Sequence, residues 1–127
     1  MEIVTDLERM DFSRIHGWLA GAYWCPGVSR EKVERAARHS SLVVGAFEGR
    51  EQVGYLRIVS DRTTFAWVCD VWVGEGYRGR GIARAMVTRA LEDPEHQGLR
   101  RWLLATGSEE HTSELQSHLN LVCRLLL

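Results

Sequence analysis

The chain has 127 residues, of which 45% are hydrophobic and 26% charged, and its formal net charge is −1. This composition is typical of one globular domain and excludes a disordered or collagen-like chain. No apolar run approaches the ~20 residues of a membrane-spanning helix, and the first residues lack the basic and apolar regions of a signal peptide. We therefore expect a cytoplasmic protein without a membrane partner.

Charge and cysteine usage exclude further classes of function. A net charge near zero provides no overall field that would select nucleic acid. The cysteines Cys25, Cys69 and Cys123 are odd in number and lack the spacing of a metal site. We expect reduced thiols, no metal and no nucleic-acid partner.

Two helices are predicted in the first forty residues. Apolar residues recur at helical spacing from Asp11 to Trp24, and Asp11 is suited to cap that helix. The segment Cys25-Pro26-Gly27 predicts a turn. Ser29 is a second N-cap, and the helix after it has a buried stripe of Val33, Ala36, Ala37 and Ser40.

Strands dominate the middle of the chain. The predicted strands are Leu42–Phe47, Gln52–Ser60 and Thr64–Val73, with turns at 48–51 and at 61–63. A glycine-rich loop over 74–81 leads into a helix from Ile82 to about Glu92, which Pro94 stops. A further strand is predicted over Arg101–Thr106. The pattern indicates a mixed α/β (α+β) domain.

The glycine-rich loop carries the clearest chemical indication. Its glycines lie between a strand and a helix start, where free backbone N–H groups and the helix dipole suit a phosphate. Gly79 and Gly81 would let a ligand approach the backbone, and Arg78 and Arg80 add positive charge. The alternative is a glycine-rich turn with solvated arginines.

Three phosphate-binding motifs compete for this loop. A P-loop needs Lys followed by Ser or Thr, and neither dipeptide is present. A Rossmann fingerprint needs an early βαβ unit, whereas antiparallel strands precede this loop. Arg78, Gly81 and Ala83 fit the pattern R-x-x-G-x-[G/A], which resembles the acetyl-CoA signature of the GNAT (Gcn5-related N-acetyltransferase) superfamily.

The resemblance extends over roughly residues 1–106. The segments that look like a bacterial subgroup of small GNAT acetyltransferases are Tyr23-Trp24, Ser40, Val53-Gly54-Tyr55, Arg57, Ser60-Asp61, Phe65-Ala66-Trp67 and Cys69-Asp70-Val71. The resemblance implies a central, mostly antiparallel sheet flanked by helices. It also implies that the Thr64–Val73 strand carries a bulge and diverges from the Arg101–Thr106 strand.

Acetyl-CoA is the co-substrate that the resemblance implies. Backbone groups of Val71, Trp72 and Val73 would bind its pantetheine arm as an added strand. Its pyrophosphate would lie on the N–H groups of Gly79, Arg80, Gly81, Ile82 and Ala83. The fold would place the thioester deep in the cleft, opposite an acceptor amine.

The implied chemistry is direct acetyl transfer to an amine, which must first lose a proton. Asp70 is the candidate base because it lies beside the implied bulge; the alternative is a structural carboxylate held by the backbone or by Arg57. Tyr23 and Trp24 are candidates for the wall of the acceptor pocket; the alternative is core aromatics. We expect Cys69 to be a buried apolar residue, Asp61 a turn residue, and His39 and His96 surface residues.

The last twenty residues look foreign to this family. Residues 108–117 are what a common sequencing-library adapter encodes, and Leu121–Leu127 match the constant end of that adapter. We therefore expect an incomplete GNAT domain over 1–107, with its C-terminal strands missing or replaced, and an adapter-derived tail over 108–127. The alternative is a natural amphipathic helix that uses Leu115, Leu119 and Val122.

Three functions remain open from the sequence. The first is an acetyl-CoA-dependent N-acetyltransferase acting on a small-molecule or peptide amine, with a homodimer left open. The second is a non-catalytic module that binds acyl-CoA or regulates another protein. The third is a small RNA-associated domain using Arg78, Arg80, Arg84 and Arg89, although such a charge set is usually a solvated face.

Overall fold

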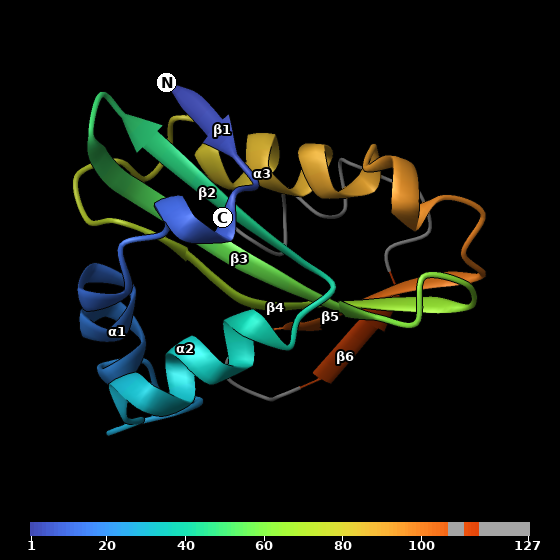
Figure 1. The fold of residues 1–127 in the computed structure, drawn as a ribbon, viewed down its shortest axis with the longest axis horizontal. Helices are drawn as coiled ribbons and strands as arrows, with labels where there is room; N and C mark the ends of the chain where they lie inside the picture. The colour runs from blue at the N-terminus through green and yellow to red at the C-terminus, as the bar shows by residue number, and fades with distance from the viewer. Residues whose placement is uncertain (107–110, 115–127) are drawn as a thin grey trace.

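The computed structural model describes residues 1–106 and 111–114. Its centre is a six-stranded sheet in the order β1-β2-β3-β4-β5-β6 (Figure 1). The strands are β1 (Glu2–Val4), β2 (Leu42–Glu48), β3 (Glu51–Ser60), β4 (Phe65–Val73), β5 (Arg101–Thr106) and β6 (His111–Glu114). Only the β4–β5 pair is parallel, so the predicted mixed, mostly antiparallel architecture is confirmed.

Helices cover both faces of this sheet. Helices α1 (Phe12–Ala20) and α2 (Arg30–Arg38) lie on one face, and α3 (Ile82–Leu91) lies on the other (Figure 1). Two short 3-10 helices, η1 (Leu7–Arg9) and η2 (Pro94–His96), complete the regular structure of the described residues. No helix among those residues is both long enough and apolar enough to span a bilayer.

The predicted caps of α1 and α2 are confirmed. The Asp11 side chain accepts a hydrogen bond from the Arg14 backbone N–H, and Ser29 accepts one from that of Lys32. The sequence predicted that this helix continues to Trp24. In the structure α1 ends at Ala20, because the chain turns back there. The N–H of Gly27 donates to the carbonyl of Ala20, which closes this turn.

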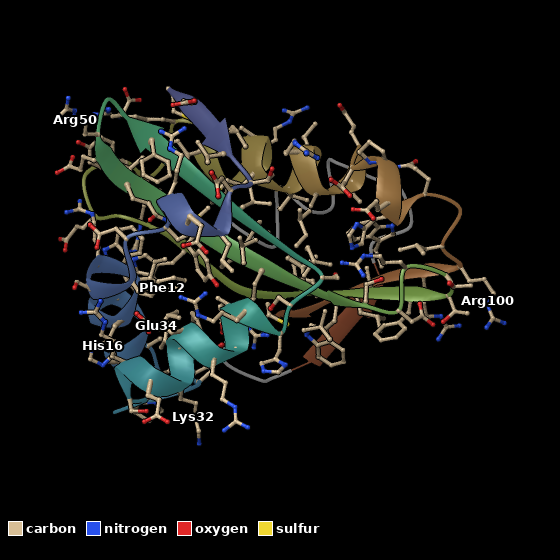
Figure 2. All side chains as sticks on the ribbon, viewed as in Figure 1. Phe12, His16, Lys32, Glu34, Arg50 and Arg100 are labelled. Atoms are coloured by element: carbon tan, nitrogen blue, oxygen red, sulfur yellow. The ribbon has the colours of Figure 1, made fainter. Side chains whose placement is uncertain are left out.

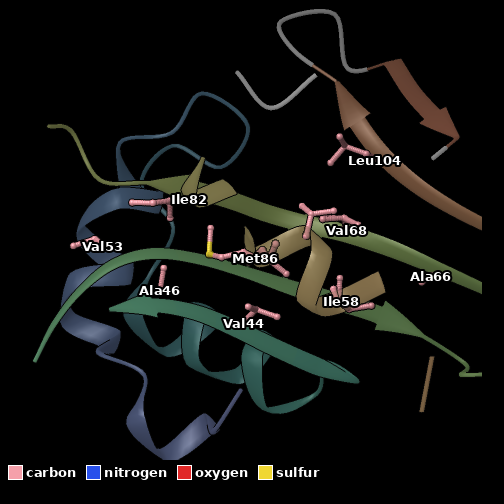
Figure 3. Packing of buried hydrophobic residues seen from close by; sticks show 12 residues of the cluster. Val44, Ala46, Val53, Ile58, Ala66, Val68, Ile82, Met86 and Leu104 are labelled. Atoms are coloured by element: carbon pink, nitrogen blue, oxygen red, sulfur yellow. The ribbon is translucent and has the colours of Figure 1, made fainter. Parts of the chain in front are cut away.

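The larger core lies between the sheet and α3. Figure 3 shows Val44, Ile58 and Val68 from three adjacent strands around Met86 of α3. Gly54 allows the close approach of α3, since a Cβ at that position would lie 3.0 Å from the Met86 Cε. This packing fixes α3 on the sheet, and with it the loop before α3.

A second core lies under α1 and α2. Ile15, Val33 and Tyr55 are buried together on that face of the sheet. Phe12, at the start of α1, packs into the same cluster, while Lys32, Arg50 and Arg100 lie on the outside (Figure 2).

Several features differ from the sequence-based predictions. Strand β1 was not predicted, and neither was the strand at His111–Glu114, which pairs with β5. His39 is exposed as predicted, but the prediction for His96 is wrong because its side chain is buried. Leu115, Leu119, Val122 and the greater part of the predicted tail lie outside the described residues.

Truncation of Met86 should destabilise the fold. Met86 is completely buried, so Met86→Ala should lower the free energy of unfolding by about 2–5 kcal/mol, through lost apolar contact and the cavity left behind. Urea denaturation followed by circular dichroism measures this. Arg84→Ala on the exposed face of the same helix is the control and should change stability by less than about 0.5 kcal/mol. Equal losses for the two variants would contradict the assigned core.

Candidate active site

Strand β4 has a bulge where it pairs with β3. Tyr55 pairs with Trp72 and Arg57 with Cys69, so two steps along β3 correspond to three along β4. Asp70 lies in this bulge with a φ of 55°, in the left-handed region. Asp tolerates this region better than most residues, although glycine is the usual occupant of such bulges. The bulge implied by the family resemblance is therefore confirmed.

The pairing of β4 with β5 ends early. The parallel register runs from Phe65–Arg101 to Val68–Leu104, whereas β4 itself continues to Val73. Within the described residues, this edge of β4 therefore has no strand partner from Cys69 onward. Unpaired backbone groups on a strand edge can accept an extended ligand as an added strand.

Two side chains donate hydrogen bonds to Asp70, one to each carboxylate oxygen. The Arg57 Nε donates to the Asp70 Oδ2 at 2.7 Å, and the Trp24 Nε1 donates to the Oδ1 at 3.2 Å. Burial lowers the pKa of Arg57, but its hydrogen bond and ion pair with Asp70 outweigh that effect, so the pKa is raised overall. The contact between Asp70 and Arg57, which the structural alternative requires, is therefore present.

Aromatic residues surround one side of Asp70. The Tyr23 and Trp24 rings meet edge to face with their centroids 5.1 Å apart, and Trp24 lies 6.2 Å from Trp72. Tyr23 is 56% exposed and Trp24 39%, so the core-aromatic alternative for this pair is wrong. The two rings therefore present exposed aromatic surface near Asp70.

The glycine-rich loop presents free backbone donors. Gly79 and Gly81 have φ angles of 79° and 78°, and Gly81 occupies the N-cap of α3 without a side-chain cap. No described residue accepts a hydrogen bond from the N–H groups of 79–84. A Cβ at Gly79 or Gly81 would meet no atom of the described residues within 4 Å, so the loop borders open space at these two positions.

The loop arginines make contacts that the sequence did not predict. The Arg78 Nε donates to the carbonyl of Val73 at 2.9 Å, and its guanidinium lies 4.9 Å from the Trp72 ring centroid. The Arg80 guanidinium lies over the Tyr77 ring, at 5.3 Å from its centroid. The Val73 carbonyl is therefore already engaged, which leaves fewer groups of β4 for an added strand.

Cys69 lies next to Asp70 but is not activated. Burial raises the pKa of its thiol to about 11, and the charge of Arg57 only partly offsets this effect. The thiol donates weakly to the carbonyl of Trp67. A thiol in this state is a poor nucleophile at neutral pH.

The structure brings most of the predicted site residues together. Asp70, Trp24, Tyr23 and Trp72 form one contacting group, and Arg78 joins it to the glycine-rich loop. Sequence reasoning named Arg57 only as an alternative partner, since no local pattern shows that β3 faces the bulge. Among the described residues, no group of three side chains is arranged to bind a metal ion.

Comparison with known proteins agrees with this geometry. A crystal structure from Xanthomonas campestris pv. campestris, assigned to GNAT acetyltransferases, is 35% identical, with a TM-score of 0.82 over 97% of this chain and 80% of that one. An aminoglycoside 6'-N-acetyltransferase complexed with coenzyme A is 15% identical, with a TM-score of 0.71 over 99% and 83% of the two chains. A GNAT acetyltransferase from Brucella melitensis in complex with acetyl-CoA is also 15% identical, with a TM-score of 0.64 over 84% and 76%.

These matches differ in what they establish. The structures at 15% identity show the fold alone, and no curated protein sequence matches the chain. The chain does match the acetyltransferase (GNAT) family over residues 1–114, which includes β4, the glycine-rich loop and α3. The protein therefore belongs to the GNAT family of acetyltransferases.

Proposed function

We propose that the protein transfers the acetyl group of acetyl-CoA directly to an amine of a small molecule or peptide. The observation that carries the proposal is that two sets of unpaired backbone groups, among the described residues, occur at one location. The unpaired edge of β4 and the free N–H groups at the start of α3 are joined by one eight-residue loop, 74–81. Asp70 lies at the beginning of that unpaired edge.

The residues present fit acetyl-CoA. The pyrophosphate would be held by N–H groups from Gly79 to Ala83, at the positive end of α3. The pantetheine arm would lie along the β4 edge at 71–73, apart from the Val73 carbonyl that Arg78 occupies. When bound, acetyl-CoA supplies the thioester carbon that the acceptor amine attacks.

The acceptor would be placed by Asp70 and the aromatic residues beside it. An alkylammonium has a pKa near ~10.4 and must release a proton before it can attack. A carboxylate offers about four lone-pair positions, and Arg57 and Trp24 use two of them. Asp70 can therefore accept this proton directly or through water, while Tyr23 and Trp24 contact the body of the acceptor.

A non-catalytic acyl-CoA-binding module is the second candidate. The observation that favours it is that both Asp70 oxygens already have donors, which is also what a purely structural carboxylate would have. The two candidates share the CoA site and differ in whether Asp70 takes part in turnover. The effects of changes at Gly81 and at Asp70 therefore separate them.

A carboxylate in the glycine-rich loop should prevent CoA binding. Gly81→Asp would place a negative side chain in the open space before the α3 donors, so we expect CoA affinity to fall at least ~100-fold through repulsion and crowding. Isothermal titration with CoA measures this. Gly98→Asp is the matched control, because Gly98 also has a positive φ of 73° but lies outside the loop. Binding by the Gly81 variant equal to the control would disprove the assigned phosphate site.

Removal of the Asp70 charge should slow turnover. If Asp70 accepts the amine proton, Asp70→Asn should lower kcat by about 10²–10⁴, with part of the loss recovered at high pH. Rates would be measured with acetyl-CoA and a panel of amines from pH 6 to 10. Asp61→Asn is the control, because Asp61 caps the neighbouring turn through Thr63 and Thr64. A loss below tenfold at all pH values would favour the non-catalytic candidate.

Cys69 should not carry the acetyl group. With a pKa of about 11, only roughly 0.03% of the thiol is ionised at pH 7.5, so alkylation by iodoacetamide should be slow and should accelerate toward pH 11. Peptide mass spectrometry after timed alkylation measures this. Rapid labelling of Cys69 at pH 7.5, or an acetyl-cysteine trapped with acetyl-CoA, would contradict direct transfer.

A further inference from the structure

A chain of three polar side chains lies on the α3 face of the sheet, away from the candidate active site. The His96 Nδ1 is 2.8 Å from the Asp93 Oδ2, and the His96 Nε2 is 2.8 Å from the Ser41 Oγ. Asp93 follows the C-terminus of α3, His96 belongs to η2, and Ser41 precedes β2. The ten residues of α3 span about 15 Å, and they separate these three side chains from the glycine-rich loop.

The hydrogen-bond partners of His96 indicate which nitrogen of its ring carries a proton. Burial raises the pKa of Asp93, but hydrogen bonds from His96 and Arg89 outweigh burial and lower the pKa overall. A carboxylate only accepts hydrogen bonds, so the His96 Nδ1 must carry the proton. In the neutral form of the ring, the Nε2 therefore carries the lone pair, and it lies 2.8 Å from the Ser41 Oγ.

Burial protects this arrangement from water. His96 is 1% exposed and Asp93 6%, while Ser41 is half-buried. The Asp93 Oδ1 is held by the Arg89 Nη1 at 2.9 Å, so the carboxylate cannot rotate freely. Ser41 is the least buried of the three residues.

The environment of Ser41 suits a nucleophile. The Ser41 hydroxyl donates to the Ile58 carbonyl at 3.0 Å, and the same carbonyl accepts the backbone N–H of Ser41 at 2.8 Å. The His96 Nε2 lies 2.8 Å from the same Oγ, and an imidazole nitrogen can take up a proton whereas an amide carbonyl cannot, so His96 is the base within reach of Ser41. The Arg62 guanidinium donates to the Ser41 carbonyl at 3.0 Å, which places a positive charge beside Ser41.

We propose that Ser41, His96 and Asp93 form a second reactive centre, in which Ser41 attacks small activated esters and related phosphorus electrophiles. Nucleophile, base and orienting carboxylate occupy the positions of a hydrolytic triad. The Ser41 Oγ forms a bond to the acyl carbon as its proton passes to the His96 Nε2. The ester C–O bond breaks, and the leaving alcohol takes that proton. Water then hydrolyses the acyl-serine to a carboxylic acid and restores Ser41.

Labelling with diisopropyl fluorophosphate tests the proposal without CoA or an amine. The Ser41 Oγ would bond to phosphorus as fluoride leaves, and the serine proton would pass through His96 to solvent. Ser40 is an internal control, because it is also half-buried but its hydroxyl contacts the Ala36 carbonyl and the Arg57 guanidinium rather than a histidine. Peptide mass spectrometry should find Ser41 labelled about 10²–10⁴ times faster than Ser40.

Two variants show whether the histidine and aspartate act on Ser41. Asp93→Asn favours the other His96 tautomer and should slow the labelling of Ser41 at least ~100-fold. Arg84→Gln changes an exposed residue of the same helix that contacts none of the three residues, so labelling should change less than about threefold. p-Nitrophenyl acetate should give a burst of one nitrophenolate per protein molecule in the parent and in the Arg84 variant.

Two results would overturn the proposal. Equal labelling of Ser41 and Ser40 in the parent protein would show that the three residues serve only to hold η2 against β2. Unchanged labelling in a folded Asp93→Asn variant would show that Ser41 reacts without the triad. The comparison within the parent protein does not depend on how any variant folds.

Discussion

The extra residue at Asp70 determines which side chains can meet in the candidate site. Residues at even spacing along a strand share a face, so without a bulge Asp70 and Trp72 would join Val68 on the α3 face. After the bulge, Val71 and Val73 pack on that face instead, and Asp70 and Trp72 turn toward α1 and α2. A left-handed Asp costs about 1–2 kcal/mol, which its bonds to Arg57 and Trp24 help to offset.

The pairing of Asp70 with Arg57 also sets the electrostatics of the site. A lone carboxylate would attract an ammonium ion and hold it in the protonated form. With the Arg57 guanidinium 2.7 Å from Oδ2, the pair is close to neutral, so this attraction is weak. Under the proposed function, the exposed rings of Tyr23 and Trp24 would then provide most of the contact with the acceptor, and an uncharged amine would be bound nearly as well as a charged one.

The sequence predicted the features that depend on neighbouring residues. Asp11 and Ser29 cap helices because each reaches an N–H three residues away, and that spacing is visible in the sequence. The bulge at Asp70 came from family resemblance, since no local pattern marks a non-glycine residue with positive φ. The position of the glycine-rich loop before α3 was predicted from both sources.

Features that depend on distant contacts could not be predicted in this way. His96 follows Pro94 and Glu95, a polar context that normally indicates the surface. Its burial depends on Ser41, which lies 55 positions earlier in the chain. The contact between Trp24 and Asp70 likewise spans 46 positions, so the aromatic pair could be assigned to the acceptor pocket only through resemblance.

The two sites lie on opposite faces of one sheet and are built on neighbouring residues. Arg57 and Ile58 are adjacent in β3, and because successive strand residues alternate, one faces Asp70 and the other packs in the α3 core. Ser40 and Ser41 divide in the same way, since Ser40 contacts Arg57 whereas Ser41 contacts His96. A shift of β3 against β2 would therefore disturb both sites. A displacement of α3 or η2 would alter the contacts of Ser41 directly. It would affect Asp70 only through the sheet.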